Sequence, residues 1–301
     1  MNPILALIIA NIIWGAAPPI FKFALQNIPP FTLAFIRFYF AGLLILLFVK
    51  NLKVDLRKVE WLELLLGAIF GISVNITFFF WGLQRGESIN SAVIISSGPV
   101  FLYFLSIIFL REKPQLKVLS GMLVALLGVL LIIFAPVIFN GQTFSPGELQ
   151  GNLFFVIATL GAVLHSLLQK NVIEKIGPLK VSLISFFVGA VTFLPFMLGE
   201  LKSWSFNELS LNGWTGIIFG VFFSSALAYY LYSYGLGKIK AQEVGIFVYV
   251  DPIVAVAIAA PLLHEYPDLY FFLGSILVFG GIYIAEGRLH WHPIDKLKVK
   301  N

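Results

Sequence analysis

The stretch GLQRGESINSAVIISSGP at residues 82–99 returns as GLGKIKAQEVGIFVYVDP at residues 235–252, displaced by 153 positions. The same displacement, without a gap, aligns further identical residues: Trp61 with Trp214, Glu112 with Glu265, Pro114 with Pro267, Gly121 with Gly274, and Gly128 with Gly281. An internal repeat of this length determines the architecture, because each copy must form a similar unit. Both copies here are series of apolar segments, which is a common plan of membrane transporters.

The first part of each copy agrees at a displacement of 148 instead, which aligns Lys22 with Lys170, Pro30 with Pro178, and Phe38 with Phe186. The difference between the two displacements fits a longer loop near Leu201–Leu211. We therefore predict a first repeat at residues 1–140, an external linker at 141–147, a second repeat at 148–288 and a basic cytoplasmic tail at 289–301.

The composition excludes a soluble globular protein. Hydrophobic residues make up 59% of the chain and charged residues only 12%, about half the charge of a soluble domain. Cysteine is absent, so neither a disulfide framework nor a thiolate metal site is expected. No GKS or GKT follows any glycine, so the sequence lacks a phosphate-binding loop and predicts no ATP-driven transport and no cofactor.

Ten apolar segments are long enough to cross a bilayer core, which needs roughly 20 residues of helix. Their runs are continuously apolar rather than alternating, which favours helices over barrel strands. We predict an all-α membrane protein with ten transmembrane helices: Pro3–Ala24, Pro30–Val49, Trp61–Leu83, Ile89–Leu110, Leu116–Pro136, Gly151–Leu168, Leu179–Leu198, Trp214–Leu236, Gln242–Leu263 and Leu269–Ile284.

The positive charges predict the orientation. Of the 20 Lys and Arg residues, Arg37 lies within a span, and only Lys22, Arg85 and Lys202 fall on one side of the predicted membrane. All others fall in the opposite loops and the tail, which predicts that both termini lie in the cytoplasm. The expected location is the plasma membrane. The excess charge thus indicates orientation and contact with anionic membrane lipids, rather than a nucleic-acid partner.

Each copy has five spans, an odd number, so the second copy must cross the membrane in the opposite sense to the first. The loop charges agree: REKP at residues 111–114 is predicted cytoplasmic, and its counterpart HEYP at residues 264–267 has lost both fixed positive charges. Two inverted five-helix repeats usually enclose a substrate site near the midplane between them.

The motifs resemble the EamA repeat of the drug/metabolite transporter superfamily. They comprise Trp14 and Gly15 followed by Lys22, PFTLAFIRF at residues 30–38, Pro99, and REKP at residues 111–114 with Gly121 and Gly128. The second copy keeps Pro252, Glu265, Pro267, Gly274 and Gly281, but carries Ala162 in place of Trp14. The resemblance implies secondary export or exchange of small metabolites, such as amino acids, through a central cavity.

Four prolines within spans are candidate helix hinges. Pro18 and Pro19 deprive the carbonyls of Trp14 and Gly15 of their helical partners, which suits a helix beside a hydrated cavity. Pro99 and Pro252 occupy equivalent places in the two copies, and paired helix interruptions point to a binding site. Simple packing kinks without ligand contact are the alternative.

Asp251 and Arg37 are the charged residues most deeply placed within spans. A charge near the midplane is costly, so Asp251 should face water, protein or a partner. It is a candidate to couple protons or to hold a substrate amine; otherwise it is protonated or caps the helix at Pro252. Arg37 is a candidate partner for a substrate carboxylate, or else a scaffold that snorkels or ties freed carbonyls to Asp251.

The remaining predicted substrate-binding residues are uncharged or weakly basic: Trp14, Asn75, Phe79, Ser96, His165, Tyr229 and Tyr249. For each of them, helix packing is the alternative role. His165 has no second ligand three or four residues away, so no metal site is predicted.

These observations together predict a secondary transporter that moves a small-molecule substrate by alternating access, as an exporter or exchanger, with protons as a candidate coupling ion. The alternative is a lipid or polyprenyl-phosphate flippase, for which Arg37 and Lys22 would be the only cationic anchors. An intramembrane enzyme is not predicted, because only His165 and Asp251 lie at depth and no motif joins them.

Overall fold

The computed structural model of the chain describes residues 1–49, 60–101, 105, 116–140, 146–238 and 245–286. Every regular element in these ranges is a helix, so the prediction of an all-α protein is confirmed. The predicted loop at 111–114, most of the linker and the tail at 289–301 lie outside the described residues. The next helix begins at Pro146, a residue that favours the first helical position, and the bounds of the repeats and of the linker stay predictions.

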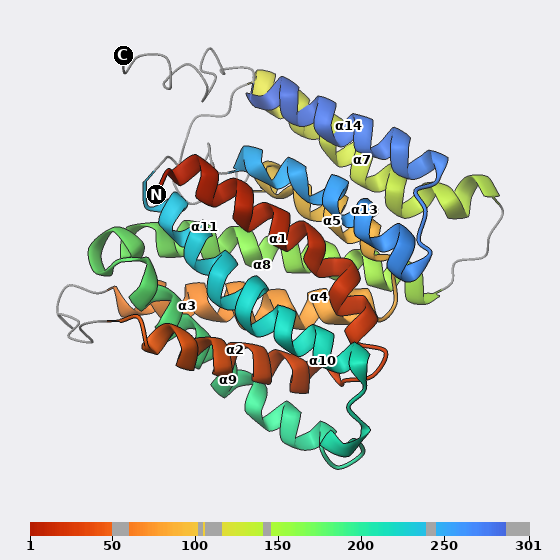
Figure 1. Cartoon of the computed structure of the whole chain (residues 1–301). Coiled ribbons are helices and arrows are strands. Elements are labelled where there is room, and N and C mark those ends of the chain that lie inside the picture. The colour runs from red at the N-terminus through yellow and green to blue at the C-terminus, as the bar shows by residue number, and fades with distance from the viewer. Residues whose placement is uncertain (50–59, 102–104, 106–115, 141–145, 239–244, 287–301) are drawn as a thin grey trace.

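The elements follow each other as a bundle of long helices joined by short loops (Figure 1). In order they are α1 (Pro3–Ala24), α2 (Pro30–Leu46), α3 (Trp61–Ala68), the π-helix η1 (Ile69–Val74), α4 (Asn75–Leu83), α5 (Ser88–Ser96), α7 (Leu116–Asn140), α8 (Pro146–Ile176), α9 (Pro178–Glu200), the 3₁₀ turn η2 (Phe206–Glu208), α10 (Leu211–Ile218), the π-helix η3 (Phe219–Leu227), α11 (Ala228–Leu236), the 3₁₀ helix η4 (Gly245–Val250), α13 (Asp251–Leu263) and α14 (Leu269–Glu286).

Five of these helical stretches are long and apolar enough, by length and composition, to cross a membrane. They are Pro3–Ala24, Trp61–Leu83, Gly147–Ile176, Pro178–Glu200 and Leu211–Leu236. Five shorter apolar helices accompany them: Pro30–Leu46, Ser88–Phe101, Leu119–Ile132, Asp251–Leu263 and Leu269–Gly281. The length and composition of these helices are those of an integral membrane protein. The number of spans and the side of the membrane on which the termini lie stay predictions.

The two copies pack against each other through equivalent helices. α2 contacts its counterpart α9, and α7 contacts its counterpart α14 along the edge of the bundle (Figure 1). In the middle, α1 packs on α10, α11 and α13 of the second copy, while its counterpart α8 packs on α3, α4 and α5 of the first. The first helix of each copy is thus held by the third and fourth helices of the other.

Glycines bring α7 and α14 into backbone contact. A Cβ atom on Gly281 would lie 2.3 Å from the carbonyl oxygen of Gly121, and one on Gly128 would lie 2.5 Å from that of Gly274. The two helices are antiparallel, because the earlier glycine of α7 contacts the later glycine of α14, and the later glycine of α7 contacts the earlier one of α14. Gly121 and Gly128 are the repeat equivalents of Gly274 and Gly281, so the two contacts are the same contact made twice, and close packing of small residues is a principal source of helix association in membranes.

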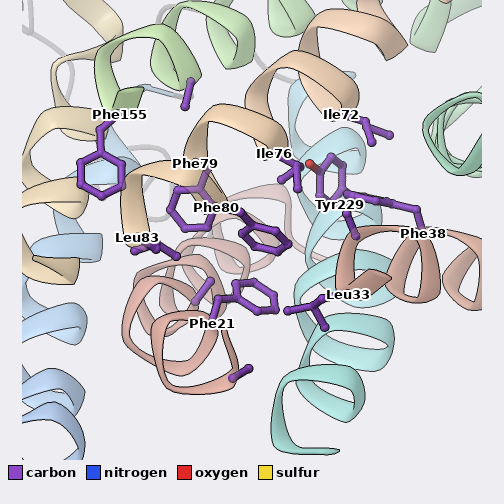
Figure 2. Close-up of a cluster of buried hydrophobic side chains, with 14 of the residues drawn as sticks. Phe21, Leu33, Phe38, Ile72, Ile76, Phe79, Phe80, Leu83, Phe155 and Tyr229 are labelled. Carbon is purple, nitrogen blue, oxygen red and sulfur yellow. The ribbon is translucent and has the colours of Figure 1, made fainter. Parts of the chain in front are cut away.

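An aromatic core fills the space between α1, α2, α4 and α11 (Figure 2). The Phe21 ring meets the Phe80 ring edge-on at 5.3 Å between centroids, and Phe38 meets Tyr229 in the same manner at 6.0 Å. All four side chains are buried. Since these rings come from both copies, the core joins the halves rather than stabilising each alone.

The glycine contact predicts a sharp difference between two neighbouring substitutions in α14. Gly281→Ala should lower stability by about 1–3 kcal/mol, because the new methyl group meets backbone that cannot yield. Gly280 has open space around it, so Gly280→Ala should be neutral or slightly stabilising. Thermal unfolding of the two detergent-solubilised variants measures this, and equal midpoints would show that α7 and α14 do not pack through these glycines.

Candidate functional site

A cavity of about 190 Å³ lies between the two copies. Its lining comes from α1, α2, η1, α4, α5 and the residues after it, α8, η3, α11, η4 and the start of α13. Most predicted site residues line it: Trp14, Asn75, Phe79, His165, Tyr229 and Asp251, with Arg37, Pro18 and Pro99. Ser96, Pro19 and Pro252 do not line it, and the side chain of Tyr249 lies outside the described residues. Substrate binding by any of them remains a prediction.

The first helix of each copy contributes equivalent positions to the cavity. Asn11, Trp14, Ala17 and Pro18 line it from α1. Their counterparts at a displacement of 148 line it from α8: Thr159, Ala162, His165 and Ser166. Residues three, four and seven apart share one face of a helix, so each first helix turns the same face to the site.

The third and fourth helices repeat this equivalence at a displacement of 153. Ile76 and Phe79 correspond to Tyr229 and Tyr232, and all four line the cavity. Gly98 corresponds to Asp251 in the same way. The frame of the site is therefore symmetric, whereas its chemistry differs between the halves, with Asp251 and His165 in the second copy and Trp14 in the first.

Two π-helical segments flank the cavity at equivalent places, η1 in the first copy and η3 in the second. Such segments break the regular helical hydrogen-bond pattern and are frequent at functional sites. Cavity side chains bond the nearby carbonyls: Trp14 Nε1 donates to the Ser224 carbonyl at 3.1 Å, and Tyr229 Oη points to the equivalent Gly71 carbonyl at a long 3.5 Å. The indole and phenol groups thus donate hydrogen bonds to backbone carbonyls of the π-helices.

Arg37 is enclosed inside the protein, with 1% of its side chain exposed. Its Nε donates to Ser225 Oγ at 3.0 Å and its Nη2 to Ser224 Oγ at 3.1 Å. The guanidinium carbon lies 4.5 Å from the Phe21 ring and 4.7 Å from the Phe38 ring, at cation–π distance. Nη1 has no hydrogen-bond partner within the described part of the chain. Arg37 is therefore buried, and the hydrogen bonds it makes to described residues go to serine hydroxyl groups.

Asp251 is the first residue of α13, at the junction with η4, and 6% of it is exposed. Its backbone packs directly on α1, since a Cβ atom on Gly15 would lie 2.8 Å from the Asp251 Cα atom. Its Oδ1 atom has no hydrogen-bond partner among the described residues, and the N-cap position of α13 is taken by Val250. A buried carboxyl group with a free oxygen is thus placed at the cavity.

The other predicted polar residues are mainly bound to backbone. His165 Nδ1 lies 2.9 Å from the Gly67 carbonyl, which assigns the ring proton to Nδ1 and leaves Nε2 as the acceptor. Asn75 Nδ2 donates to the Ala158 carbonyl at 2.7 Å, and Ser96 Oγ to the Ala92 carbonyl at 2.8 Å. No cluster of three metal-ligating side chains occurs in the ranges that the structure describes.

Sequence reasoning missed four polar lining residues: Thr159, Ser166, Ser224 and Tyr232. Ser166 Oγ and Tyr232 Oη lie 2.9 Å apart and link α8 to α11 beside Trp14. The internal repeat could have indicated two of them. Thr159 is the repeat equivalent of Asn11, and Tyr232 is the repeat equivalent of the predicted site residue Phe79. Ser224 enters through a π-helix, for which the apolar sequence carries no indication.

An ion pair ties three elements together beyond one end of the cavity. Lys22, which follows the lining residue Phe21 on α1, places Nζ 2.5 Å from Glu265 Oε1. The other Glu265 oxygen accepts hydrogen bonds from Ser88 N at 2.8 Å and Ser88 Oγ at 2.6 Å, at the start of α5. Glu265 follows α13, so one carboxylate joins α1, α5 and the end of α13.

Glu87 lies beside this ion pair, in the loop before α5. Burial raises its pKa to about 7, and the negative charges of Glu265, Glu148 and Asp268 act in the same direction, while Lys22 opposes them. At neutral pH this carboxyl group is therefore divided between its charged and neutral forms.

The raised pKa of Glu87 predicts a stability that falls with rising pH. The folded protein holds this proton more tightly than a free glutamate, whose pKa is 4.5, so its contribution is complete below about pH 4.5 and lost as the pH rises through about 7. Unfolding midpoints between about pH 5 and pH 8 should decline for the wild type and decline less for Glu87→Gln. The exposed Glu174→Gln variant is the control, and parallel curves for all three proteins would contradict the assignment.

A bundle of apolar helices around a small, mostly apolar cavity with a few inward polar groups defines a helical membrane protein, and such a cavity has the character of a small-molecule site. Residues 1–134 and 149–286 each match the model of the EamA-like transporter family. The chain belongs to this family, whose members are transporters, and the resemblance drawn from the motifs is confirmed.

Relatives and a solved structure match over nearly the full chain. An uncharacterized transporter of Archaeoglobus fulgidus is 30% identical, across 90% of this chain and 94% of the relative. The uncharacterized transporter YetK of Bacillus subtilis is 29% identical, across 95% and 87%. A probable amino-acid metabolite efflux pump of Escherichia coli is 24% identical, across 98% and 97%. One crystal structure has the same fold, with a TM-score of 0.69, 17% identity and coverage of 96% and 98%.

Proposed function

We propose that the protein is a secondary transporter that moves small metabolites across the plasma membrane by alternating access, as an exporter or exchanger. The observation that carries this proposal is the cavity, because equivalent positions of the two copies line it. A site on the boundary between two repeats can be exposed to either side when the repeats move against each other. Membership of a transporter family supports the same reading.

The proposed topology has ten transmembrane helices in two inverted repeats, at residues 1–140 and 148–288, with both termini in the cytoplasm. Antiparallel contact between equivalent helices, as in α7 and α14, supports the inversion. α1 begins and α14 ends at the same end of the bundle in Figure 1, which agrees with an even number of crossings.

Amino acids or similar compounds are the proposed substrates, since two relatives are named as probable amino-acid metabolite efflux pumps. Protons remain a proposed coupling ion. Among the described residues that line the cavity, Asp251 is the only carboxylate available for this role. Pro18, Pro19, Pro99 and Pro252 remain the proposed hinges.

A lipid flippase is less well supported. Its cationic anchors would have to meet a lipid phosphate, but Lys22 is paired with Glu265 and Arg37 is enclosed by rings and hydroxyl groups. A cavity surrounded by helices of both copies suits a small solute better than a lipid headgroup with its chains.

Counterflow in proteoliposomes tests the proposed function. Purified protein should exchange a radiolabelled metabolite for the same unlabelled compound within a panel of amino acids, nucleosides and other small metabolites. Empty liposomes and heat-inactivated protein are the controls. A panel in which no compound exchanges above these controls would exclude a small-metabolite carrier.

The Lys22–Glu265 contact predicts that transport stops when this end is held closed. The chain has no cysteine, so a Lys22→Cys, Glu265→Cys double variant carries only the two engineered thiols. A short, reducible thiol cross-linker should abolish counterflow in the double variant, and reductant should restore it. Once the cross-link is reduced, position 22 on α1 can separate again from position 265. Each single variant is the control, and undiminished exchange by the cross-linked protein would show that this end does not open.

A further inference from the structure

One buried carboxylate joins three elements beyond the end of the cavity, through contacts that we call the Glu265 link. Glu265 Oε1 lies 2.5 Å from Lys22 Nζ on α1. Glu265 Oε2 accepts hydrogen bonds from Ser88 N, Ser88 Oγ and, at 3.3 Å, Ile89 N at the start of α5. Lys22 Nζ also donates to the Gly86 carbonyl at 2.8 Å. The link thus fixes α1 and the start of α5 to the residue that follows α13.

Glu87 stands between the two loop residues that take part in this link, Gly86 and Ser88. It occupies the N-cap position of α5, where a side chain normally bonds the first N–H groups of the helix. The Glu87 side chain makes no such bond, and Glu265 holds the N–H groups of Ser88 and Ile89 instead. An ionised Glu87 therefore competes with Glu265 for the same helix end.

The loop that carries Glu87 is packed directly against α8. A Cβ atom on Gly151 would lie 2.6 Å from Gly86 N, closer than any real contact of that kind. Glu148 precedes Gly151 by three residues and shares its face of α8. Glu87 is thus half-buried in a helix contact, with a second carboxylate on the helix that covers its loop.

Two other ionisable groups of this region need to be separated from Glu87. The guanidinium group of Arg85 donates to the Trp81 carbonyl at 3.1 Å and lies 5.5 Å from the Phe154 ring. His264 ends α13 in the left-handed conformation and is exposed. Since histidine is the usual source of a pH response near neutrality, His264 is the residue that a test must exclude.

The charge of Glu87 is less favourable in the linked arrangement than in an open one. Burial raises its pKa from 4.5 to about 7, and the negative charges of Glu265, Glu148 and Asp268 act in the same direction, while Lys22 opposes them. When the elements separate, Glu87 gains water and leaves these charges, so its pKa returns toward 4.5. The linked arrangement holds the proton more tightly, and it loses this advantage as the pH rises through about 7.

We propose that ionisation of Glu87 releases the Glu265 link. While Glu87 is neutral, Glu265 keeps both Lys22 and the start of α5. Once Glu87 is charged, it repels Glu265 and competes for the same donors, which frees α1 from the residue after α13. This end of the cavity is then held closed at acidic pH and released at alkaline pH. Its opening during transport rests on the proposed function, whereas the release of the link does not.

Hydrogen exchange of the full-length, detergent-solubilised protein tests the release at the donors themselves. The amides of Ser88 and Ile89 are protected while they bond Glu265, and they exchange when the link opens. Between about pH 6 and pH 8 their protection, relative to the unfolded chain at each pH, should fall about three- to tenfold in the wild type. In Glu87→Gln the protection should change by less than about twofold. A fall below about threefold in the wild type, or an equal fall in Glu87→Gln, would overturn the proposal.

The start of α2 provides a matched internal control. Its amides of Phe31 and Thr32 are held in the same way by a distant carboxylate, that of Glu200 in α9. Their protection should follow the same course in the wild type and in Glu87→Gln. An equal fall at both helix starts would mean general loosening rather than release of the link, and would contradict the proposal. Should Glu87→Gln not fold, this comparison within the wild type decides.

His264→Gln separates the carboxyl group from the histidine. The variant should keep the full response at the start of α5, because Glu87 is unchanged. Loss of the response in His264→Gln would assign it to the histidine and overturn the proposal.

The outcomes also separate this inference from the proposed function, because hydrogen exchange needs no transported compound. Counterflow of a metabolite together with a pH-independent link would overturn the inference and leave the transporter in place. Release of the link by Glu87 in a protein that exchanges no compound would support the inference and count against the transport function.

Discussion

A polar group inside a membrane protein must find its partner within the protein, because the surrounding lipid offers none. The neighbourhood of the cavity follows this constraint closely. Trp14 bonds a carbonyl in one π-helix, His165 bonds a carbonyl just before the other, and Ser224 and Ser225 each take one donor of Arg37. Arg37 Nη1 and Asp251 Oδ1 are exceptions, because neither has a hydrogen-bond partner among the described residues.

The repeat provides a symmetric frame, and substitutions at equivalent positions make the site directional. The repeat equivalent of Trp14 is Ala162, that of Ala17 is His165, and that of Gly98 is Asp251. All six residues line the cavity. The described lining residues thus hold one carboxyl group, in the second copy, and one guanidinium group, in the first, so the two halves of the site differ in charge.

Much of this arrangement could be predicted from the sequence, because apolar periodicity and the displacement of 153 are properties of the chain itself. The bounds of Pro3–Ala24 and Trp61–Leu83 agree with the structure to the residue. The place of Ser96 could not be predicted, since one turn of a broken helix decides whether it meets the cavity or the Val248 carbonyl, 3.3 Å away. The hydroxyl partners of Arg37 likewise depend on a π-helix that no residue pattern indicates.

The same asymmetry bears on how the transporter would cycle. In an inverted repeat, the two end states exchange the conformations of the copies, so identical copies would make them equal in energy. Here Lys22, Glu265 and Ser88 join α1, α5 and the end of α13 by specific bonds at one end of the cavity. These bonds stabilise the arrangement of the three elements seen in the structure, and a ligand shifts a balance between two states only by binding one of them more tightly. A ligand in the cavity on the boundary between the copies contacts both of them, so a movement of one copy against the other changes its binding.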